Sequence, residues 1–320
     1  VFILDANTGY INLTDDGNGH FLKTTNAGSS WSDLTNLPVP ATDWQRAVFF
    51  TDVNTGYITS SDNLDTGNIY KTINGGANWV PLTLPVHKQF CSISFINSNT
   101  GYVCGWQVIL KTTNAGTTWV SQSFPGGVEW LWSICFVNAN TGYAAGGTNS
   151  ATERYVIKTT NGGNNWQTVY SYPDGLFFGI SFIDANTGAV VGGKYVTPGS
   201  YVCRTTNGGI NWTETFTGSN VNYLWTVSFV STSIGYASGG NPGGNGLGVI
   251  LKTTNAGLNW YPQTTNANYG LLGNYFTSIN TGYVVGWGGH ILKTTDGGGN
   301  FVGIEPAGQE IPAKFHLYQN

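Results

Sequence analysis

Short runs of apolar residues alternate with polar turns along the chain. One type of run ends at a Phe shortly before an Asn-Thr-Gly turn, as in Cys91–Phe95 before Asn99–Gly101. A second run starts at that Gly, and a third reads Ile-Leu-Lys-Thr or a close variant. A Thr-Asn-Gly-Gly corner follows and leads into a fourth segment that carries a Trp. Runs of this length, bounded by Gly and Asn, predict four short β-strands joined by tight turns.

This four-strand unit occurs seven times. The corners end 40 to 48 residues apart, at Trp31, Trp79, Trp119, Trp166, Trp212, Trp260 and Phe301. Because one such unit can bury its faces only against its neighbours, this period predicts the blades of a propeller. We expect an all-β, seven-bladed β-propeller of four-stranded antiparallel blades over residues 1–304. The expected blades are 1–35, 44–84, 89–124, 130–172, 176–217, 223–265 and 270–304, with a linker and tail at 305–320.

The repeated residues are expected to form the scaffold. The corner Asn accepts a hydrogen bond from the backbone N–H two residues on, the Gly takes a left-handed conformation, and the aromatic residue packs as a plug. Lysine precedes the corner in six copies, and Arg204 takes its place in the seventh. We expect these side chains to lie along their neighbours with the charge in water.

The corner T-x-N-x-G-x-x-W resembles the Asp-box, or BNR repeat, of general form S-x-D-x-G-x-T-W. Combined with the Asn-Thr-Gly turns, the pattern over residues 1 to about 304 is most similar to propellers of the photosystem II stability and assembly factor type. The resemblance implies the propeller fold and an arginine-rich patch facing a partner. Because Arg46, Arg154 and Arg204 are the only arginines, we expect the fold without the photosynthetic role.

Charge excludes some classes of partner. Charged residues make up 9% of the chain and the net charge is −4, which gives no electrostatic basis for binding nucleic acid or anionic lipid. The sequence has no run of eighteen apolar residues that could span a bilayer. We therefore expect no nucleic-acid partner and no membrane insertion.

The chemical inventory does not favour catalysis. A sialidase clamps its substrate with three arginines, and this chain has three in total, with Arg204 in a scaffold position. A glycoside hydrolase needs two carboxylates facing one cleft. Glu129 beside Trp130 and Asp43 beside Trp44 are suggestive acids, although solvated loops are the simpler interpretation. We expect no enzyme and name no catalytic residue.

Metal and cofactor sites are also not expected. The four cysteines fall in expected strands without Cys-x-x-Cys spacing, and we expect them to be free and buried. They are Cys91, Cys104, Cys135 and Cys203. Acidic loops at 15–18 and 62–68 could supply oxygen ligands to calcium, but they do not match an EF-hand, so polar turns are favoured. We therefore expect no metal and no cofactor.

Variable loops mark a candidate face. The loops after the second and fourth strands differ most in length, and off-repeat aromatic residues gather beside them, where the first strands begin. The expected partner or ligand face comprises Trp44, Arg46, Phe90, Glu129, Trp130, Trp132, Tyr223, Trp225 and Tyr269. Such an aromatic mouth could bind peptide or glycan, or it could plug the channel and pack the blades together.

The tail suggests export. Phe315–Asn320 resembles the start of the C-terminal sorting domain of type IX secretion substrates. This resemblance implies an extracellular or cell-surface location in a bacterium. We expect a non-enzymatic structural or protein-interaction module that binds a protein partner or itself, as a homo-oligomer or polymer. The alternative is a carbohydrate-binding or glycoside-hydrolase-like protein that uses the aromatic mouth.

Overall fold

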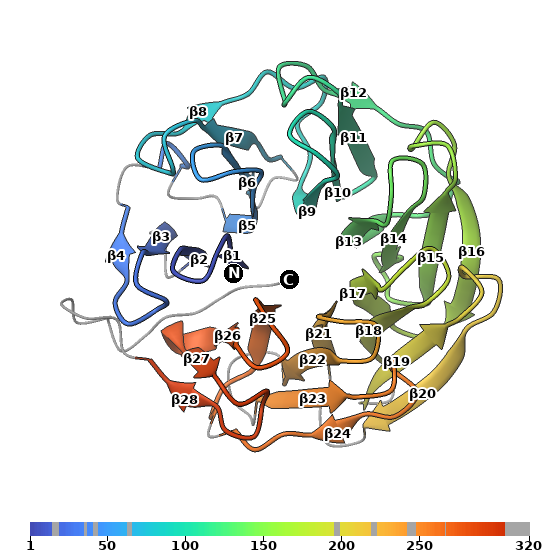
Figure 1. Cartoon of the computed structure of the whole chain (residues 1–320). Coiled ribbons are helices and arrows are strands. Elements are labelled where there is room, and N and C mark those ends of the chain that lie inside the picture. The colour runs from blue at the N-terminus through green and yellow to red at the C-terminus, as the bar shows by residue number, and fades with distance from the viewer. Residues whose placement is uncertain are drawn as a thin grey trace. The chain divides into compact units, whose positions relative to one another are not determined.

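A computed structural model describes residues 1–14, 19–34, 37–40, 44–62, 66–194, 199–218, 223–241, 248–265 and 267–304. Its strands form seven four-stranded antiparallel sheets, the blades of a β-propeller (Figure 1), and each sheet uses four strands consecutive in the chain. The expected fold class is confirmed. The expected tail at 305–320 lies outside the described residues, as do parts of both acidic loops.

One compact unit, whose strands lie within Val1–Gln122, contains three blades. Blade 1 consists of β1 (Phe2–Ile3), β2 (Gly9–Thr14), β3 (Gly19–Thr24) and β4 (Ser32–Asp33). Blade 2 consists of β5 (Trp44–Phe50), β6 (Gly56–Ser61), β7 (Ile69–Thr72) and β8 (Val80–Pro81). Blade 3 consists of β9 (Phe90–Phe95), β10 (Gly101–Gly105), β11 (Val108–Thr112) and β12 (Val120–Ser121).

The second compact unit, Ser123–Gly303, contains four blades. Blade 4 consists of β13 (Trp130–Phe136), β14 (Gly142–Gly147), β15 (Glu153–Thr159) and β16 (Gln167–Pro173). Blade 5 consists of β17 (Leu176–Phe182), β18 (Gly188–Lys194), β19 (Gly199–Thr205) and β20 (Thr213–Gly218). Blade 6 consists of β21 (Tyr223–Phe229), β22 (Gly235–Gly240), β23 (Val249–Thr253) and β24 (Tyr261–Pro262). Blade 7 consists of β25 (Leu271–Phe276), β26 (Gly282–Gly286), β27 (Ile291–Thr294) and β28 (Val302–Gly303).

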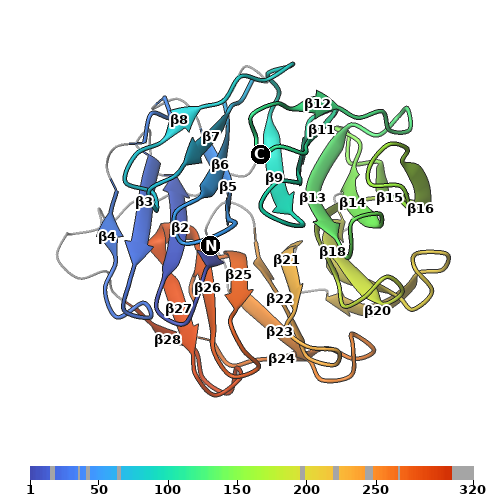
Figure 2. The same cartoon turned by 45° about the horizontal axis from the view of Figure 1, so that its top comes forward.

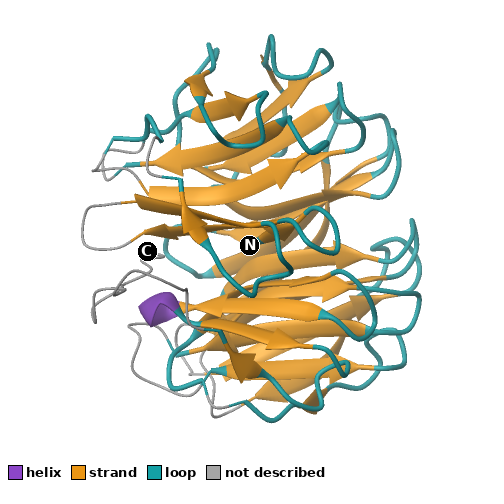
Figure 3. Cartoon of the chain, turned by 60° about the vertical axis from the view of Figure 1, so that its left-hand side comes forward, coloured by secondary structure: helices purple, strands orange, loops and turns teal. Residues whose placement is uncertain are grey.

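Within the second unit, successive first strands lie next to each other, β13 beside β17, β17 beside β21 and β21 beside β25 (Figures 1 and 2). Blade 7 also contains a single 3₁₀ turn at Trp287–Gly289, drawn in purple in Figure 3. This stacking of inner strands brings side chains of neighbouring blades together at the start of each first strand.

The fourth strands differ in length between blades. β16 has seven residues and β20 has six, whereas β4, β8, β12, β24 and β28 have two each. The repeat aromatic residue was expected inside this strand, but it lies just before it, as Trp79 does before β8. Blades 4 and 5 are therefore extended at their outer edges.

Hydrogen bonds at the corner differ from the expected pattern. In blade 4, Thr159 Oγ1 accepts the N–H of Gly163 at 2.9 Å, and Asn161 Oδ1 accepts the N–H of Asn165, four residues on, at 2.9 Å. The bond from two residues on occurs in the other turn, where Asn138 Oδ1 accepts the N–H of Asn140 at 2.9 Å. Gly163 has φ of 85°, as expected for a left-handed turn.

The ammonium group of the repeated Lys bonds to the next blade, which the sequence did not predict. Lys158 Nζ donates to Gly208 O in the next blade at 2.8 Å, and Tyr143, opposite Lys158 on the second strand, donates its OH to the same oxygen at 3.2 Å. The same lysine bond joins Lys23 to Gly75, Lys71 to Ala115 and Lys252 to Gly297. In blade 5, where Ala189 replaces the Tyr, Arg204 Nε donates to Ala256 O at 2.6 Å. The repeated cation therefore ties each of these blades to its successor.

The aromatic plugs lie at the same place in each blade. Trp31, Trp79, Trp119, Trp166, Trp260 and Phe301 are buried, and Trp212 is half-buried. Trp79 meets the ring of Phe50 edge-on at 6.0 Å, and Trp166 meets Phe136 in the same way at 5.9 Å. These contacts fill the interior of the blades, so the plugs act as scaffold.

Candidate functional site

A β-bulge interrupts the first strand of blades 2 to 7. The residue left without a register partner always stands four residues before the last Phe of that strand. The bulge residues are Arg46, Cys91, Trp132, Phe178, Trp225 and Leu272. Because a bulge re-aims the side chain that it frees, these six positions are special within the repeat.

In blades 3 to 7 a glycine of the second strand makes room for the bulge, whereas blade 2 has Ser60 at this position. A Cβ at Gly146 would stand 1.7 Å from Trp130 O, and one at Gly192 would stand 1.9 Å from Leu176 O. No side chain fits at that distance, so the close approach of the two backbones requires Gly. The bulge and its Gly together fix where the following aromatic side chains lie.

In the first unit, the expected site residues Trp44, Arg46 and Phe90 lie at the start of β5 and β9. Trp44 pairs with Ser61, and its side chain lies outside the described part of the structure. Arg46 donates from Nε to Ser61 Oγ at 2.8 Å, and burial lowers the pKa of its guanidinium. Phe90 is fully buried in a core that blades 2 and 3 share, where its side chain packs against both.

In the second unit, six aromatic residues form a continuous row. The indoles of Trp130 and Trp132 stack with centroids 4.8 Å apart, and Trp132 meets Phe178 at 5.7 Å. Phe178 lies 4.5 Å from Trp225, measured between ring centroids. We call the set Trp130, Trp132, Phe178, Tyr223, Trp225 and Trp287 the aromatic row.

The row continues into blades 6 and 7 of this unit. The ring centroid of Trp225 lies 5.1 Å from that of Tyr223 and 6.3 Å from that of Trp287. Trp132, Phe178, Trp225 and Trp287 are buried, whereas Trp130 and Tyr223 are half-buried. The sequence therefore identified four of the six members, and the structure connects them through three consecutive bulge residues.

The indole N–H groups of the row are unevenly satisfied. Trp130 Nε1 donates to Asn149 Oδ1 at 3.2 Å. Among the described residues, Nε1 of Trp132, Trp225 and Trp287 has no hydrogen-bond acceptor, although each atom is buried. Nε1 of the scaffold residues Trp79, Trp119 and Trp166 is likewise buried without an acceptor among the described residues, so this feature is not particular to the row.

Two carboxylates lie at the blade 4 end of the row. Glu129 Oε2 accepts the backbone N–H of Asn149 at 2.5 Å. Glu153 accepts hydrogen bonds from the hydroxyls of Ser171 and of Tyr155, the latter at 3.3 Å. Burial raises the pKa of Tyr155 to about 12, and the negative charges of Glu153 and Glu129 add to this effect. Both carboxylates therefore lie close to the same phenol.

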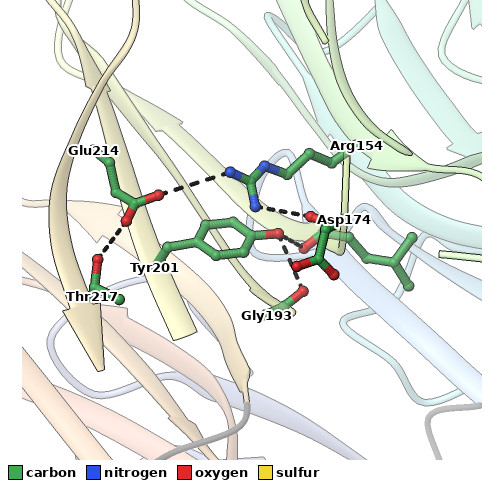
Figure 4. A network of polar contacts seen from close by, with 7 residues as sticks. Arg154, Asp174, Gly193, Tyr201, Glu214 and Thr217 are labelled. Atoms are coloured by element: carbon green, nitrogen blue, oxygen red, sulfur yellow. Dashed lines mark hydrogen bonds and ion pairs between the residues drawn. The ribbon is translucent and has the colours of Figure 1, made fainter. Parts of the chain in front are cut away.

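A buried arginine joins blades 4 and 5 beside this region (Figure 4). Arg154 is 1% exposed, and its Nη1 donates to Asp174 O at 3.0 Å. Its guanidinium lies 3.8 Å from the centroid of the Tyr201 ring, and Nη2 lies 3.8 Å from Glu214 Oε2. Tyr201 in turn donates its OH to Leu176 O at 2.5 Å. This network holds the extended strands in place and engages Glu214 as a structural acid.

The remaining expected site residue, Tyr269, makes its ring contact with a residue outside the row. Tyr269 is 38% exposed and contacts the ring of His290 at 5.0 Å. The four cysteines form no disulfide, as expected, but only Cys104 and Cys203 are buried, whereas Cys91 and Cys135 are half-buried. Within the described ranges, no group of three or more His, Cys, Asp and Glu could hold a metal ion, and no helix is long and apolar enough to cross a membrane.

Sequence reasoning missed Phe178 and Trp287 as row members and Arg154 as a buried residue. Phe178 could have been found by counting four residues back from Phe182, because Trp132 and Trp225 stand at the same distance before Phe136 and Phe229. No spacing or repeat position in the sequence indicates that Arg154 is buried. Its burial depends on the length of β16 and β20, which departs from the repeat.

Comparisons with known proteins support the fold. No protein-family profile and no curated protein sequence matches the chain. Among solved structures, the chain is similar to YCF48 bound to a D1 peptide, with 20% identity, a TM-score of 0.63 and coverage of 84% of this chain and 83% of the other. It is also similar to YCF48 from Cyanidioschyzon merolae, with 15% identity, a TM-score of 0.65 and coverage of 92% and 93%.

Larger proteins share the architecture as well. The GH74 xyloglucanase from Xanthomonas campestris aligns with 11% identity and a TM-score of 0.67, over 93% of this chain and 52% of the enzyme. The GH74 enzyme from Niastella koreensis aligns with 13% identity and a TM-score of 0.55, over 93% of this chain and 64% of the enzyme. At these identities the matches establish that the chain is a seven-bladed β-propeller.

Proposed function

We propose that this protein is a non-enzymatic interaction module that binds a protein partner along the aromatic row. The observation that supports this most strongly is the row itself, which spans blades 4 to 7 of the second unit. Aromatic residues with few charges form the energetic centre of many protein interfaces. One similar structure is YCF48 bound to a D1 peptide, which supports a peptide as the type of partner.

The state of the acidic residues favours binding over catalysis. A glycosidase acid needs a raised pKa and access to the substrate. Glu214 is paired with Arg154 and accepts the hydroxyl of Thr217, and Glu153 accepts two hydroxyls. Glu129 is fixed by the backbone of Asn149. Each of these carboxylates thus has a structural task.

Selection of binders from a displayed random-peptide library, followed by titration calorimetry, tests the proposal. Trp130→Ala and Tyr223→Ala should each weaken binding of a selected peptide about tenfold or more, as expected for aromatic anchors. Tyr261→Ala is the matched control, because Tyr261 is 58% exposed on β24 and outside the row. If the library yields no peptide whose binding depends on the row, the proposal fails.

The second candidate function is glycan binding, which the aromatic row also favours because sugar rings stack on indoles. A glycan array and a xyloglucan hydrolysis assay on the same protein distinguish the two. Row-dependent glycan binding without peptide binding would replace the first proposal, and hydrolysis of xyloglucan would make the protein an enzyme.

We further propose that the protein is exported to the bacterial surface or the medium and associates with itself there. The motif Phe315–Asn320 supports the export, and the sparse surface charge is compatible with it. Cell fractionation of the tagged full-length protein tests the location. Sedimentation velocity over a range of concentrations tests the self-association, and a constant monomer mass would exclude it.

A further inference from the structure

We propose that Asn74, Asn161 and Asn207 are latent deamidation sites, which the folded corners keep unreactive and which react only when a corner opens. Each of these residues precedes a glycine, whereas alanine follows the corner Asn in blades 1, 3 and 6. The inference concerns a covalent modification of the scaffold and goes beyond the proposed binding function.

An Asn followed by Gly is a reactive pair, because glycine has no Cβ to shield its backbone nitrogen. That nitrogen attacks Cγ of the Asn side chain and forms a C–N bond, and the amide group leaves as ammonia with the proton that the nitrogen loses. The product is a cyclic succinimide. Water then opens the ring at one of its two carbonyls and gives either aspartate or isoaspartate, whose backbone is one carbon longer. The reaction needs only water and adds one negative charge.

In all three corners the attacking N–H is already hydrogen-bonded. The N–H of Gly162 donates to Asn140 O at 2.8 Å, and this glycine is buried, as are its two counterparts. The same bond, at 2.8 and 2.9 Å, joins Gly208 to Asn186 and Gly75 to Asn54. The folded corner therefore engages the nucleophile and shields it from the hydroxide that would remove its proton.

The side chain that would be attacked is fixed as well. Asn161 Oδ1 accepts the hydroxyl of Thr159 at 3.0 Å and the N–H of Asn165 at 2.9 Å. The Oδ1 atoms of Asn74 and Asn207 accept the equivalent pairs of bonds, all between 2.9 and 3.1 Å. Cγ can turn towards the glycine nitrogen only after these bonds break, so the reaction requires local opening of the corner.

The alanine corners show the alternative to glycine. Ala27, Ala115 and Ala256 have φ of 57°, 54° and 57°, a left-handed conformation that is uncommon for residues with a Cβ. Glycine adopts the same conformation without strain, with φ of 65°, 66° and 68° in the three proposed sites. A glycine corner is thus less strained than an alanine corner, but its Asn is more reactive once the corner opens.

Modification of a corner would weaken a link between blades. Gly208 O accepts hydrogen bonds from Lys158 Nζ at 2.8 Å and from Tyr143 OH at 3.2 Å. Conversion of Asn207 to isoaspartate lengthens the backbone directly before Gly208 and displaces this carbonyl. Conversion to aspartate is less damaging, because Asp296 occupies the same corner position in blade 7 and makes the equivalent hydrogen bonds.

Peptide mapping by mass spectrometry after incubation at neutral pH tests the inference. In the folded wild type, Asn74, Asn161 and Asn207 should deamidate at least about tenfold more slowly than in protein unfolded by guanidinium chloride, because the reaction requires opening. The variant Ala256→Gly adds a fourth Asn-Gly corner, at Asn255. This corner should react in the unfolded chain and remain protected in the folded protein.

Threonine variants test whether each corner opens by itself. Thr159→Ala removes the acceptor of the Gly163 N–H and the donor to Asn161 Oδ1. It should speed deamidation of Asn161 about fivefold, the effect of one lost hydrogen bond on the opening equilibrium, and leave Asn207 unchanged. Thr205→Ala should do the reverse. Thr159→Ser keeps the hydroxyl and should react at the wild-type rate.

The outcomes are distinct. Equal rates in the folded and unfolded wild type overturn the proposal, and so does an Ala256→Gly protein that reacts as fast when folded as when unfolded. A Thr159→Ala variant that is folded by thermal melt yet speeds both sites alike would place the reaction in the globally unfolded chain and exclude local opening. If Thr159→Ala does not fold, the wild type and Ala256→Gly still decide. None of these results bears on the aromatic row, so the proposed function is tested separately.

Discussion

At the scale of single residues, paired positions explain how the blades are joined. Tyr and Lys face each other on the second and third strands, and both reach the same corner carbonyl of the next blade. Where Ala189 removes the Tyr, Arg204 replaces the Lys and makes the bond alone. The two substitutions compensate because the longer guanidinium still satisfies the carbonyl of Ala256.

Removing the tyrosine hydroxyl should weaken this link. In Tyr143→Phe, the carbonyls of Ala185 and Gly208 lose a donor, at 2.9 and 3.2 Å in the wild type. We expect the free energy of unfolding to fall by about 1 kcal/mol, the usual net value of one hydrogen bond. Urea denaturation measures the change. Tyr261→Phe, on an exposed tyrosine, is the control and should have no effect.

At the scale of the strand, the bulge explains why the aromatic row exists. A regular first strand would point its successive side chains alternately to the two faces, whereas the bulge inserts Trp132, Phe178 and Trp225 between register partners. In blades 4 to 6 the bulge requires a glycine at one place in the second strand, where a side chain would meet the backbone of the first strand. The pairing of the first two strands and the position of the aromatic row therefore depend on the same β-bulge.

A single methyl group should disrupt one bulge. In Gly146→Ala, the new Cβ would stand 1.7 Å from Trp130 O, so the two strands must separate. We expect a loss of about 1–3 kcal/mol, as for other overpacked sites, together with weaker peptide binding. Chemical denaturation checks the first effect. Gly126→Ala, where no atom lies within 4 Å, should be neutral, and equal effects of the two changes would contradict the argument.

The extended strands of blades 4 and 5 give a second test at this scale. Arg154→Lys removes the planar contact with Tyr201 and the bond to Asp174 O. We expect a loss of about 2 kcal/mol, because Lys does not replace a buried, stacked guanidinium. Arg204→Lys, which restores the residue used by the other blades, should change stability by less than about 0.5 kcal/mol. Melting curves of the two variants give the comparison.

At the scale of the whole molecule, periodic features were predictable and departures from the period were not. The seven corners define the blades because each repeats the same turn chemistry. The bulges leave no mark in hydrophobic alternation, and Glu129 and Trp130 could be named as candidates without showing that Asn149 holds both. Arg154 is buried only because β15, β16 and the strands of blade 5 surround it, and a repeat alignment contains no record of such contacts.

The stability of the whole chain should depend on pH in the acid range, because hydrogen-bonded carboxylates occur at its turns and corners. Backbone and side-chain hydrogen bonds from Asn300 and Thr294 lower the pKa of Asp296 to about 2 from its usual 3.8, and bonds from Asn7 and Thr8 lower the pKa of Asp5. A lowered pKa in the folded state stabilises the protein above pH 3.8, and this contribution is lost as the pH falls towards 2. Stability should therefore decline over that range.

Two corner variants test this directly. Asp296→Asn should be less stable than the wild type at pH 6, and the difference should shrink between pH 3.8 and 2, since only the wild type takes up a proton there. Asn161→Asp places a carboxylate at the equivalent corner of blade 4, where Asn165 stands as Asn300 does. It should acquire the same acid sensitivity. Midpoints of urea denaturation measured from pH 2 to 6 test both variants. If the difference in stability between a variant and the wild type stays constant across this range, the charge of the corner carboxylate does not affect stability.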